Sequence, residues 1–118
     1  MKFACLVYVD NSKLALLTPE EGAKLTDQSL EFDAGLEVRG LMNLAYPLQN
    51  PSTALTIRLR DGRVSGTDGP FAETKEQLAG FFLLDVDSRE EAARLASESP
   101  LISFGSIEIR PFLERERS

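Results

Sequence analysis

The sequence contains no histidine and no tryptophan among its 118 residues, and it has one cysteine, Cys5. Without histidine the chain lacks the commonest general base, the usual nitrogen ligand of zinc, copper and haem, and every nucleophile–histidine pair. Catalysis would therefore use carboxylates, tyrosine, lysine or backbone groups, and we predict no metal site. The lone cysteine cannot form an internal disulfide, and its place in an apolar segment predicts a buried thiol.

Charge, motifs and hydrophobic runs argue against nucleic-acid binding, nucleotide cofactors and membrane spans. Thirteen Lys and Arg stand against nineteen Asp and Glu, a net charge of -6, and the scattered basic residues form no footprint for direct nucleic-acid binding. No phosphate-binding loop or dinucleotide fingerprint is present, so we predict no cofactor. No apolar run approaches the ~20 residues of a membrane span, so we expect a soluble cytoplasmic protein without membrane contact. The length predicts a single domain, residues 1–113, followed by a charged tail, residues 114–118.

The first third of the chain has clear strand and helix signals. The apolar run from Phe3 to Val9 predicts a strand buried on both faces. Thr18-Pro19-Glu20-Glu21 has the residues of a capping box with proline at the first helical position. The predicted helix extends to about Val38 and ends before Gly40. Its apolar stripe consists of Leu25, Phe32 and Leu36.

The rest of the chain alternates between strand and helix patterns. Asp61-Gly62, between two alternating segments, predicts a two-residue β-hairpin. The other predicted elements are a strand over 41–48, one helical turn from Thr74 to Gln77, a strand over 81–87, a helix opened by Ser88 and a final strand over 106–110.

This order predicts an α+β fold, a ferredoxin-like split β-α-β sandwich with an inserted β-hairpin. Two helices can cover only one face of its sheet. The strands over 3–9 and 81–87 nevertheless carry apolar residues on both faces, so the other face would expose an apolar patch. Packing of a second copy sheet to sheet would bury this patch, which predicts a homodimer in the form of a dimeric α+β barrel.

One stretch is more specific than the others. Asp68-Gly69-Pro70-Phe71-Ala72-Glu73-Thr74-Lys75-Glu76-Gln77-Leu78, followed by Gly80-Phe81 and by Ile107-Glu108-Ile109-Arg110-Pro111, resembles the DGPF-domain branch of the YCII-related family. The resemblance covers most of the chain and implies a ferredoxin-like fold in a dimeric α+β barrel. It also implies a link to extracytoplasmic-function sigma factors, beside which members are often encoded. Founding YCII-type proteins place a histidine–aspartate pair in a cleft, and this chain has no histidine for it.

This 67–80 loop has two interpretations. In the structural one, Asp68 accepts a backbone N–H, Gly69 takes a positive φ, Pro70 stiffens the exit and Phe71 fills the core. In the functional one, the loop borders a cleft between the hairpin, the first helix and the partner subunit, with Phe71 as its floor. The candidate ligand-binding residues are Asp68, Gly69, Pro70, Phe71, Glu73, Lys75 and Tyr8. Asp68 and Glu73 are the catalytic candidates, because two carboxylates in unlike environments can serve as acid and base.

Other polar residues have plainer interpretations. Tyr8 and Tyr46, near strand ends, would present a phenol to a pocket or pack at an interface. Asp33 is predicted on the solvated face of the first helix. Three arginines, Arg58, Arg60 and Arg63, are predicted on an exposed hairpin edge, where charge opposes aggregation.

Three functions are compatible with the sequence. The first is a homodimer that binds a small molecule, or serves as an accessory protein, through a cleft at the 67–80 loop. The second is a cofactor-free, carboxylate-driven enzyme of the lyase or isomerase kind. The third is a protein-interaction module for a sigma factor, whose basic DNA-binding regions would suit an acidic partner.

Overall fold

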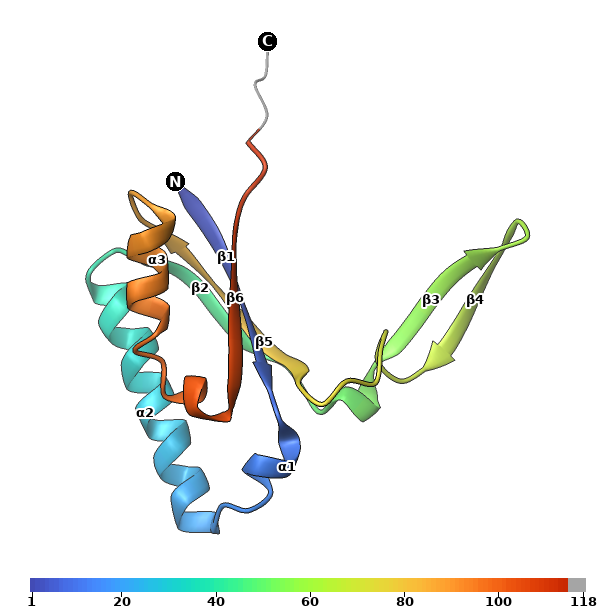
Figure 1. Ribbon diagram of the computed structural model, residues 1–118, viewed down its shortest axis with the longest axis horizontal. Helices are drawn as coiled ribbons and strands as arrows, with labels where there is room; N and C mark the ends of the chain where they lie inside the picture. The colour runs from blue at the N-terminus through green and yellow to red at the C-terminus, as the bar shows by residue number, and fades with distance from the viewer. Residues whose placement is uncertain (115–118) are drawn as a thin grey trace.

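The computed structural model describes residues 1–114, and its main elements follow the predicted order (Figure 1). Residues 115–118 of the predicted charged tail lie outside the described residues. The elements are β1 (Lys2–Val9), α1 (Asn11–Leu14), α2 (Pro19–Val38), β2 (Met42–Pro47), η1 (Pro51–Thr53), β3 (Leu55–Arg60), β4 (Arg63–Asp68), β5 (Gln77–Asp85), α3 (Arg89–Ala96), η2 (Pro100–Phe104) and β6 (Gly105–Pro111).

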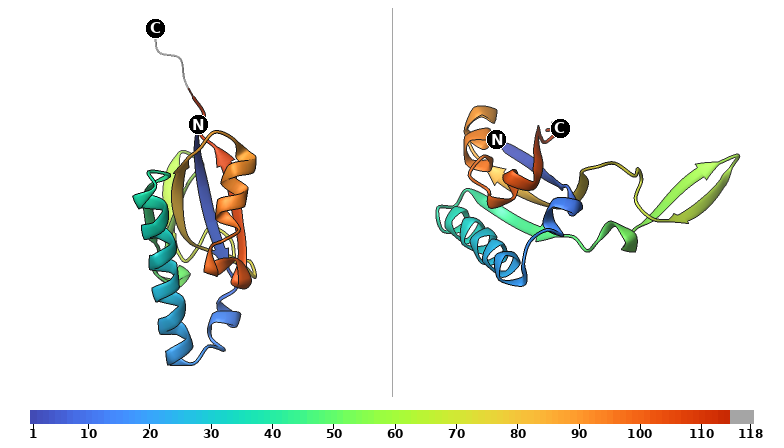
Figure 2. Two further views of the ribbon diagram at one scale, coloured as in Figure 1. Left: turned by 90° about the vertical axis from the view of Figure 1, so that its left-hand side faces the viewer. Right: turned by 60° about the horizontal axis from the view of Figure 1, so that its bottom comes forward.

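Four strands form the main sheet in the order β2-β5-β1-β6, and every neighbouring pair is antiparallel. Helices α2 and α3 both lie against one face of this sheet (Figure 2). This is the strand order of a ferredoxin-like split β-α-β sandwich, so the predicted fold class is confirmed. None of the helices in residues 1–114 is long and apolar enough to cross a membrane.

The core lies between this sheet and the two helices. Alternate residues of β1, among them Phe3 and Cys5, are fully buried, as are Leu84 of β5 and Leu95 of α3. Each buried aliphatic or aromatic side chain of this size contributes about 1.5–3 kcal/mol to folding. The predicted burial of the Cys5 thiol is confirmed.

Local signals place the ends of α2 as predicted. The Thr18 hydroxyl accepts a hydrogen bond from the Glu21 N–H at 3.1 Å, and the Glu21 carboxylate accepts one from the Thr18 N–H at 2.9 Å. Gly40 follows the helix with φ of 71°, a left-handed conformation that favours glycine. The long helix is therefore fixed at both ends by its own sequence.

The face of the sheet opposite the helices has no covering element among the described residues (Figure 2). We call it the open sheet face. Strand register places on it the side chains of Leu6, Tyr8, Leu44, Tyr46, Leu78, Phe81 and Leu83. At one edge, β6 adds the polar residues Ser106, Glu108 and Arg110. An apolar centre with a polar rim is the composition of a protein interface.

Strands β3 and β4 form a separate two-stranded sheet, which we call the arm. Asp61 and Gly62 have φ of 50° and 76°, so the predicted hairpin turn of the primed type is confirmed. At the base of the arm the Gly69 N–H donates to the Ala54 carbonyl at 2.7 Å. The arm projects from the body on the side away from the helices (Figure 1). The radius of gyration is accordingly 16.5 Å, against about 13.5 Å for a compact chain of this length.

Two local predictions differ from the structure. The helical turn predicted from Thr74 to Gln77 is wrong, because Gln77 already pairs with Val9 as the first residue of β5. The polar segment after β1, where no helix is predicted, forms the short helix α1. Asp10 caps it by accepting the Ser12 N–H at 3.0 Å.

Candidate functional site

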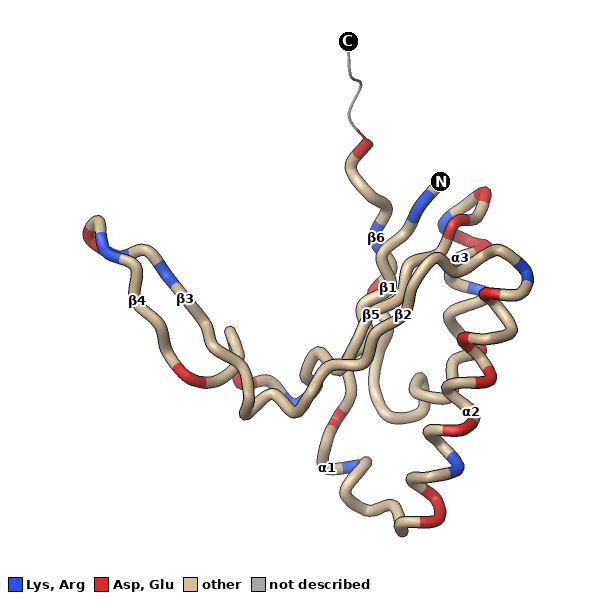
Figure 3. The backbone as a smooth tube through the Cα atoms, turned by 180° about the vertical axis from the view of Figure 1, so that it is seen from behind, with Lys and Arg blue, Asp and Glu red and all other residues tan. Residues whose placement is uncertain are grey.

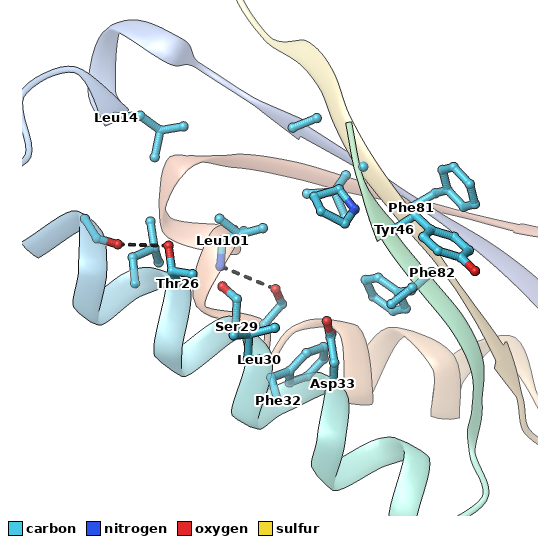
Figure 4. A pocket seen from close by; sticks show the side chains of 18 of the residues that line it. Leu14, Thr26, Ser29, Leu30, Phe32, Asp33, Tyr46, Phe81, Phe82 and Leu101 are labelled. Carbon is cyan, nitrogen blue, oxygen red and sulfur yellow. Dashed lines mark hydrogen bonds between the residues drawn. The ribbon is translucent and has the colours of Figure 1, made fainter. Parts of the chain in front are cut away.

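A cavity of about 440 Å³ lies between α2 and the sheet, and we call it the helix–sheet cavity (Figure 4). Leu25 and Phe32 of α2 form one wall, and Val7 and Phe82 of the sheet form the opposite wall. The Phe32 and Phe82 rings meet edge to face with centroids 5.9 Å apart. Its volume falls within the range of ligand pockets, and its walls are apolar, as is usual for such sites.

Two polar side chains of α2, Ser29 and Asp33, point from the helix toward this cavity (Figure 4). They are one helical turn apart and therefore share a face. The Ser29 hydroxyl is buried and has no hydrogen-bond partner among the described residues. An unpaired buried hydroxyl is unfavourable in the folded protein, so a ligand that hydrogen-bonds to it would remove this cost.

The Asp33 carboxyl is half-buried. Burial, with a smaller contribution from the negative charge of Glu37, raises its pKa above the ordinary aspartate value of 3.8. A carboxyl with a raised pKa in an apolar cavity is a common feature of binding and catalytic sites. The prediction that Asp33 lies on a solvated helix face is therefore wrong.

Two other hydroxyls of this cavity, those of Thr26 and Ser99, are already engaged. Thr26 donates to the Gly22 carbonyl at 3.1 Å, and Ser99 accepts from the Leu101 N–H at 3.3 Å. A ligand could therefore bind Ser29 and Asp33 without displacing the internal hydrogen bonds of Thr26 and Ser99.

The sequence contained a signal for this pair. Ser29 and Asp33 fall on the same helical stripe as Leu25, Phe32 and Leu36, all of which contact the core or the cavity. A polar residue within an apolar stripe either lies at its edge or serves a site. Periodicity alone does not separate the two possibilities.

A second hollow, of about 610 Å³, lies where the arm meets the body, and we call it the junction groove. Tyr8 and Leu78, a cross-strand pair of the open sheet face, line it together with Pro70 and Phe71 of the 67–80 loop. Of the seven predicted ligand-binding residues, the structure brings Tyr8, Pro70 and Phe71 together in this groove.

Phe71 does not fill the core, because 78% of its surface is exposed. Its ring lies 5.5 Å from the Arg58 guanidinium, in a cation–π contact, and its carbonyl accepts from that group at 3.4 Å. The structural interpretation of Phe71 as a core residue is therefore wrong. The exposure predicted for the hairpin arginines holds for Arg60 and Arg63, whereas Arg58 is half-buried.

The other predicted residues of the loop lie outside the lining of both hollows. Asp68, Glu73 and Lys75 are exposed, and the structure does not bring the two carboxylates together at either hollow. Gly69 has the predicted positive φ, 110°. The predicted role of these four residues in binding or catalysis stays a prediction.

Lys75 lies near the buried carboxylate of Asp10 at the end of β1. The pKa of Asp10 lies below its ordinary value, first because the Ser12 hydroxyl donates to it at 2.6 Å and to a smaller degree because of Lys75 and Lys13. Sequence analysis did not single out Asp10. Its carboxylate is engaged in capping α1, where it accepts from both the N–H and the hydroxyl of Ser12.

The loop also has internal hydrogen bonds. The Gln77 side-chain amide donates to the carbonyls of Ala72 and Thr74, at 3.2 and 2.8 Å, and Ser106 of β6 donates to Glu76 at 2.7 Å. These contacts hold one wall of the junction groove in place. Within residues 1–114, no group of three or more histidine, cysteine, aspartate or glutamate side chains could hold a metal ion.

Comparisons with known proteins give a family and a fold. The family model of the YCII-related domain matches residues 1–115. An uncharacterized protein of Rhizobium meliloti (strain 1021) is 36% identical over 115 residues, which cover 94% of this chain and 91% of that protein.

Among solved structures, the chain is similar to the 5-chloro-2-hydroxyhydroquinone dehydrochlorinase TftG from Burkholderia phenoliruptrix AC1100, solved in complex with 2,5-dihydroxybenzoquinone. The TM-score is 0.56, the sequence identity is 12%, and the match covers 98% of this chain and 96% of that chain. At this identity the likeness shows a common fold and nothing more.

Proposed function

Since this chain belongs to the YCII-related family, we propose that it is a small-molecule-binding protein whose ligand occupies the helix–sheet cavity. One observation carries the proposal. The Ser29 hydroxyl, which has no hydrogen-bond partner among the described residues, and the Asp33 carboxyl both lie inside apolar walls. Such a cavity excludes water from most of a ligand and uses a few polar groups to orient it.

The chemistry of the lining defines the ligand class. The rings of Phe32 and Phe82 favour a flat, apolar body, and Ser29 and Asp33 require hydroxyl or carbonyl groups on one side of it. A monocyclic compound that carries hydroxyl or carbonyl groups meets both conditions. The ligand named for the TftG structure, 2,5-dihydroxybenzoquinone, belongs to this class and is a suitable first probe.

The test is a calorimetric titration with 2,5-dihydroxybenzoquinone and with resorcinol. We expect Ser29→Ala and Asp33→Asn each to weaken binding by about tenfold, the cost of one lost hydrogen bond to a buried partner. Asp27→Asn is the matched control, because Asp27 is an exposed residue of the same helix. Equal affinity of all variants would contradict binding in this cavity. So would an NMR titration in which the ligand shifts only the amide signals of residues 70–77.

The junction groove is the second candidate for the binding site. It contains the predicted residues Tyr8, Pro70 and Phe71, and its volume also suits a small ligand. Phe71→Ala would weaken binding there and leave a ligand in the helix–sheet cavity unaffected. The two sites are thus distinguished by one additional variant.

Cofactor-free catalysis is a second candidate function, supported by the raised pKa of Asp33. A carboxyl in such surroundings can accept a proton from a bound hydroxylated ring and return it to another atom of the same ligand. Turnover would then depend on Asp33 ionisation, and Asp33→Asn would abolish it without abolishing binding. A pH-independent rate in the wild type would remove the support for this function.

Two finer predictions from the sequence also stand as proposals. Membership in the DGPF branch rests on the motif from Asp68 to Phe81. An accessory role with a sigma factor is compatible with the net charge of -6, which would attract basic DNA-binding regions. Co-purification at low salt with such a factor tests it.

A further inference from the structure

The arm has two faces of opposite chemical character. Residues that pair across an antiparallel ribbon share a face, and successive residues alternate between faces. The register places four large apolar side chains on one face, which we call the apolar face: Leu55, Ile57, Leu59 and Val64. These four are between 65% and 71% exposed. The other face is polar, and we call it the arginine face: Thr56, Arg58, Arg60, Arg63, Ser65 and Thr67.

The arginine face has positive charge without a compensating carboxylate. Of the two acidic residues in the arm, Asp68 lies at the base of the apolar face and Asp61 lies in the turn. Within the part of the chain that the structure describes, the three arginines form no ion pair. Arg60 and Arg63 face each other as a cross-strand pair, and like charges in this position are unfavourable. A negative group on this face would remove that cost.

The positive charge of the arm lies apart from the acidic charge of the chain. The chain has a net charge of -6, yet arginines outnumber acidic residues in the arm. Figure 3 shows basic positions near the end of the arm and acidic positions along α2, at opposite ends of a molecule whose longest extent is 53 Å. Because exposed charges are screened beyond about 8 Å in physiological salt, a partner that approaches the arm meets a locally positive surface.

The outer edge of β3 carries free backbone groups. The Gly69 N–H donates to the Ala54 carbonyl at 2.7 Å, so these two residues form a hydrogen-bonded pair at the base of the arm. Hydrogen-bonded and non-bonded pairs alternate along an antiparallel ladder, which directs the backbone groups of residues 55, 57 and 59 away from β4. Among residues 1–114, no third strand lies beside β3, and these groups have no backbone partner outside the arm. Such an edge is a template for a further strand.

A second β3 strand is a poor match for this edge. Pairing of two β3 edges through their outward backbone groups would place the arginines of both chains on one face, with no acidic residue between them. Like charges on adjacent strands oppose pairing, and charged edges of this kind prevent association of identical strands. The same arginines favour a strand whose residues on that face are acidic.

From these observations we infer that the outer edge of β3 binds an extended segment of a partner protein in which acidic and apolar residues alternate. Its apolar side chains pack beside Leu55, Ile57 and Leu59, and its carboxylates lie beside Arg58 and Arg60. Backbone hydrogen bonds supply the affinity, and the alternation of side chains fixes the register. A third strand also stabilises the arm, since a two-stranded ribbon alone is marginally stable in water. This site is separate from the helix–sheet cavity and does not depend on the proposed function.

The test is a fluorescence-anisotropy titration of the whole protein with a labelled peptide of about six residues, the usual strand length, that alternates glutamate and valine. We expect saturable binding, and we expect a peptide with lysine in place of glutamate to bind at least about tenfold more weakly. Arg60→Glu should reverse this preference, because it changes the sign of a charge beside the peptide. Lys24→Glu is the matched control, since it makes the same change on an exposed position of α2. An unchanged preference in Arg60→Glu would overturn the inference.

Methylated peptides test the backbone contacts separately. In the added strand the valine N–H groups face β3 and the glutamate N–H groups face outward, because the valines pair with residues 55, 57 and 59. N-methylation of the valines should therefore abolish binding, and N-methylation of the glutamates should leave it within about twofold. Equal binding of the two methylated peptides would show a contact through charge alone, and strand addition would be wrong.

Two other occupants of the arm have their own outcomes. If the peptide does not bind and hydrogen exchange already protects the Ile57 and Leu59 amides in the protein alone, another copy of the chain covers this edge. If an oligonucleotide displaces the peptide and binds more tightly, the arginine face is a nucleic-acid site. Either result would overturn the inference. No small ligand is present in these experiments, so failure of the proposed function would leave their results unchanged.

Discussion

Replacing Ser29 by alanine should make the protein more stable, although the change removes a hydroxyl from the helix–sheet cavity. This hydroxyl is buried and has no partner among the described residues. Serine is also a weaker helix former than alanine, and Ser29 lies in the middle of α2. Both effects raise the stability of Ser29→Ala. The variant loses the desolvation cost of the hydroxyl, and it gains the higher helix propensity of alanine.

The expected gain follows from these two contributions. Desolvation of an unpaired hydroxyl costs about 1–3 kcal/mol, and the lower helix propensity costs about 0.5 kcal/mol. We therefore expect the free energy of unfolding to rise by about 1.5–3.5 kcal/mol. With an unfolding entropy of about 0.25 kcal/mol/K for a chain of this length, the melting temperature would rise by about 6 to 14 °C.

Urea unfolding followed by circular dichroism measures this change, at one fixed protein concentration so that association does not differ between samples. Thr26→Ala is the control, since that hydroxyl lies one turn earlier and donates to the Gly22 carbonyl at 3.1 Å. Loss of this bond offsets the gain in helix propensity, so its effect should stay within about 0.5 kcal/mol. A destabilised Ser29→Ala protein would show that the hydroxyl has a bound partner, and the reasoning about an available donor would be wrong.

Three further outcomes are expected. Because the pKa of Asp33 is raised in the folded state above its ordinary value of 3.8, the folded state binds the proton more tightly than the unfolded chain. The stability that Asp33 contributes should therefore be lost as the pH rises from that value through the folded-state pKa, so the urea midpoint of the wild type should fall relative to that of Asp33→Asn over this range; parallel curves would contradict it. Burial raises the pKa of the Cys5 thiol to about 12, so reaction with a disulfide reagent should require unfolding, and fast labelling of the native protein would be inconsistent with this burial. Gly105→Ala would place a Cβ atom 1.9 Å from the Tyr8 carbonyl oxygen and should lower the free energy of unfolding in urea by about 3 kcal/mol or more. Gly35→Ala, with open space around it, should instead stabilise α2 by about 0.5–1 kcal/mol. Equal effects of the two changes would contradict the close approach of Gly105 to Tyr8.

The parts of the fold that sequence predicts well are those set by neighbouring residues. The capping box at Thr18 and Glu21, the stop at Gly40 and the turn at Asp61-Gly62 each depend on interactions within four residues, and the structure contains all of them. Element order then follows, and with it the ferredoxin-like strand arrangement.

The errors come from contacts that the local pattern does not contain. Thr74 to Gln77 has the residues of a capped helical turn, but pairing of Gln77 with Val9 draws it into β5, and its side chain binds the loop carbonyls instead. One of the two interpretations of the 67–80 loop places Phe71 in the core. Its ring instead lies beside the Arg58 guanidinium of the arm and stays 78% exposed.

The candidate site was only partly predictable for the same reason. Tyr8 and Phe71, two of the residues predicted to bind a ligand, both line the junction groove, and their role in binding stays a prediction. The helix–sheet cavity exists because α2 and the sheet leave space between their facing side chains. Residue periodicity assigns Ser29 and Asp33 to a helix face but contains no information about the distance of that face from the sheet.

The hydrogen bond between Gly69 and Ala54 brings the two ends of the arm side by side. A segment that leaves and re-enters a structure at one point can change in length or composition without moving the strands from which it grows. The body of this protein can thus keep one architecture while the arm diverges. Replacement of the arm alone, the fourteen residues 55–68, could then change the assembly partner during evolution or by design.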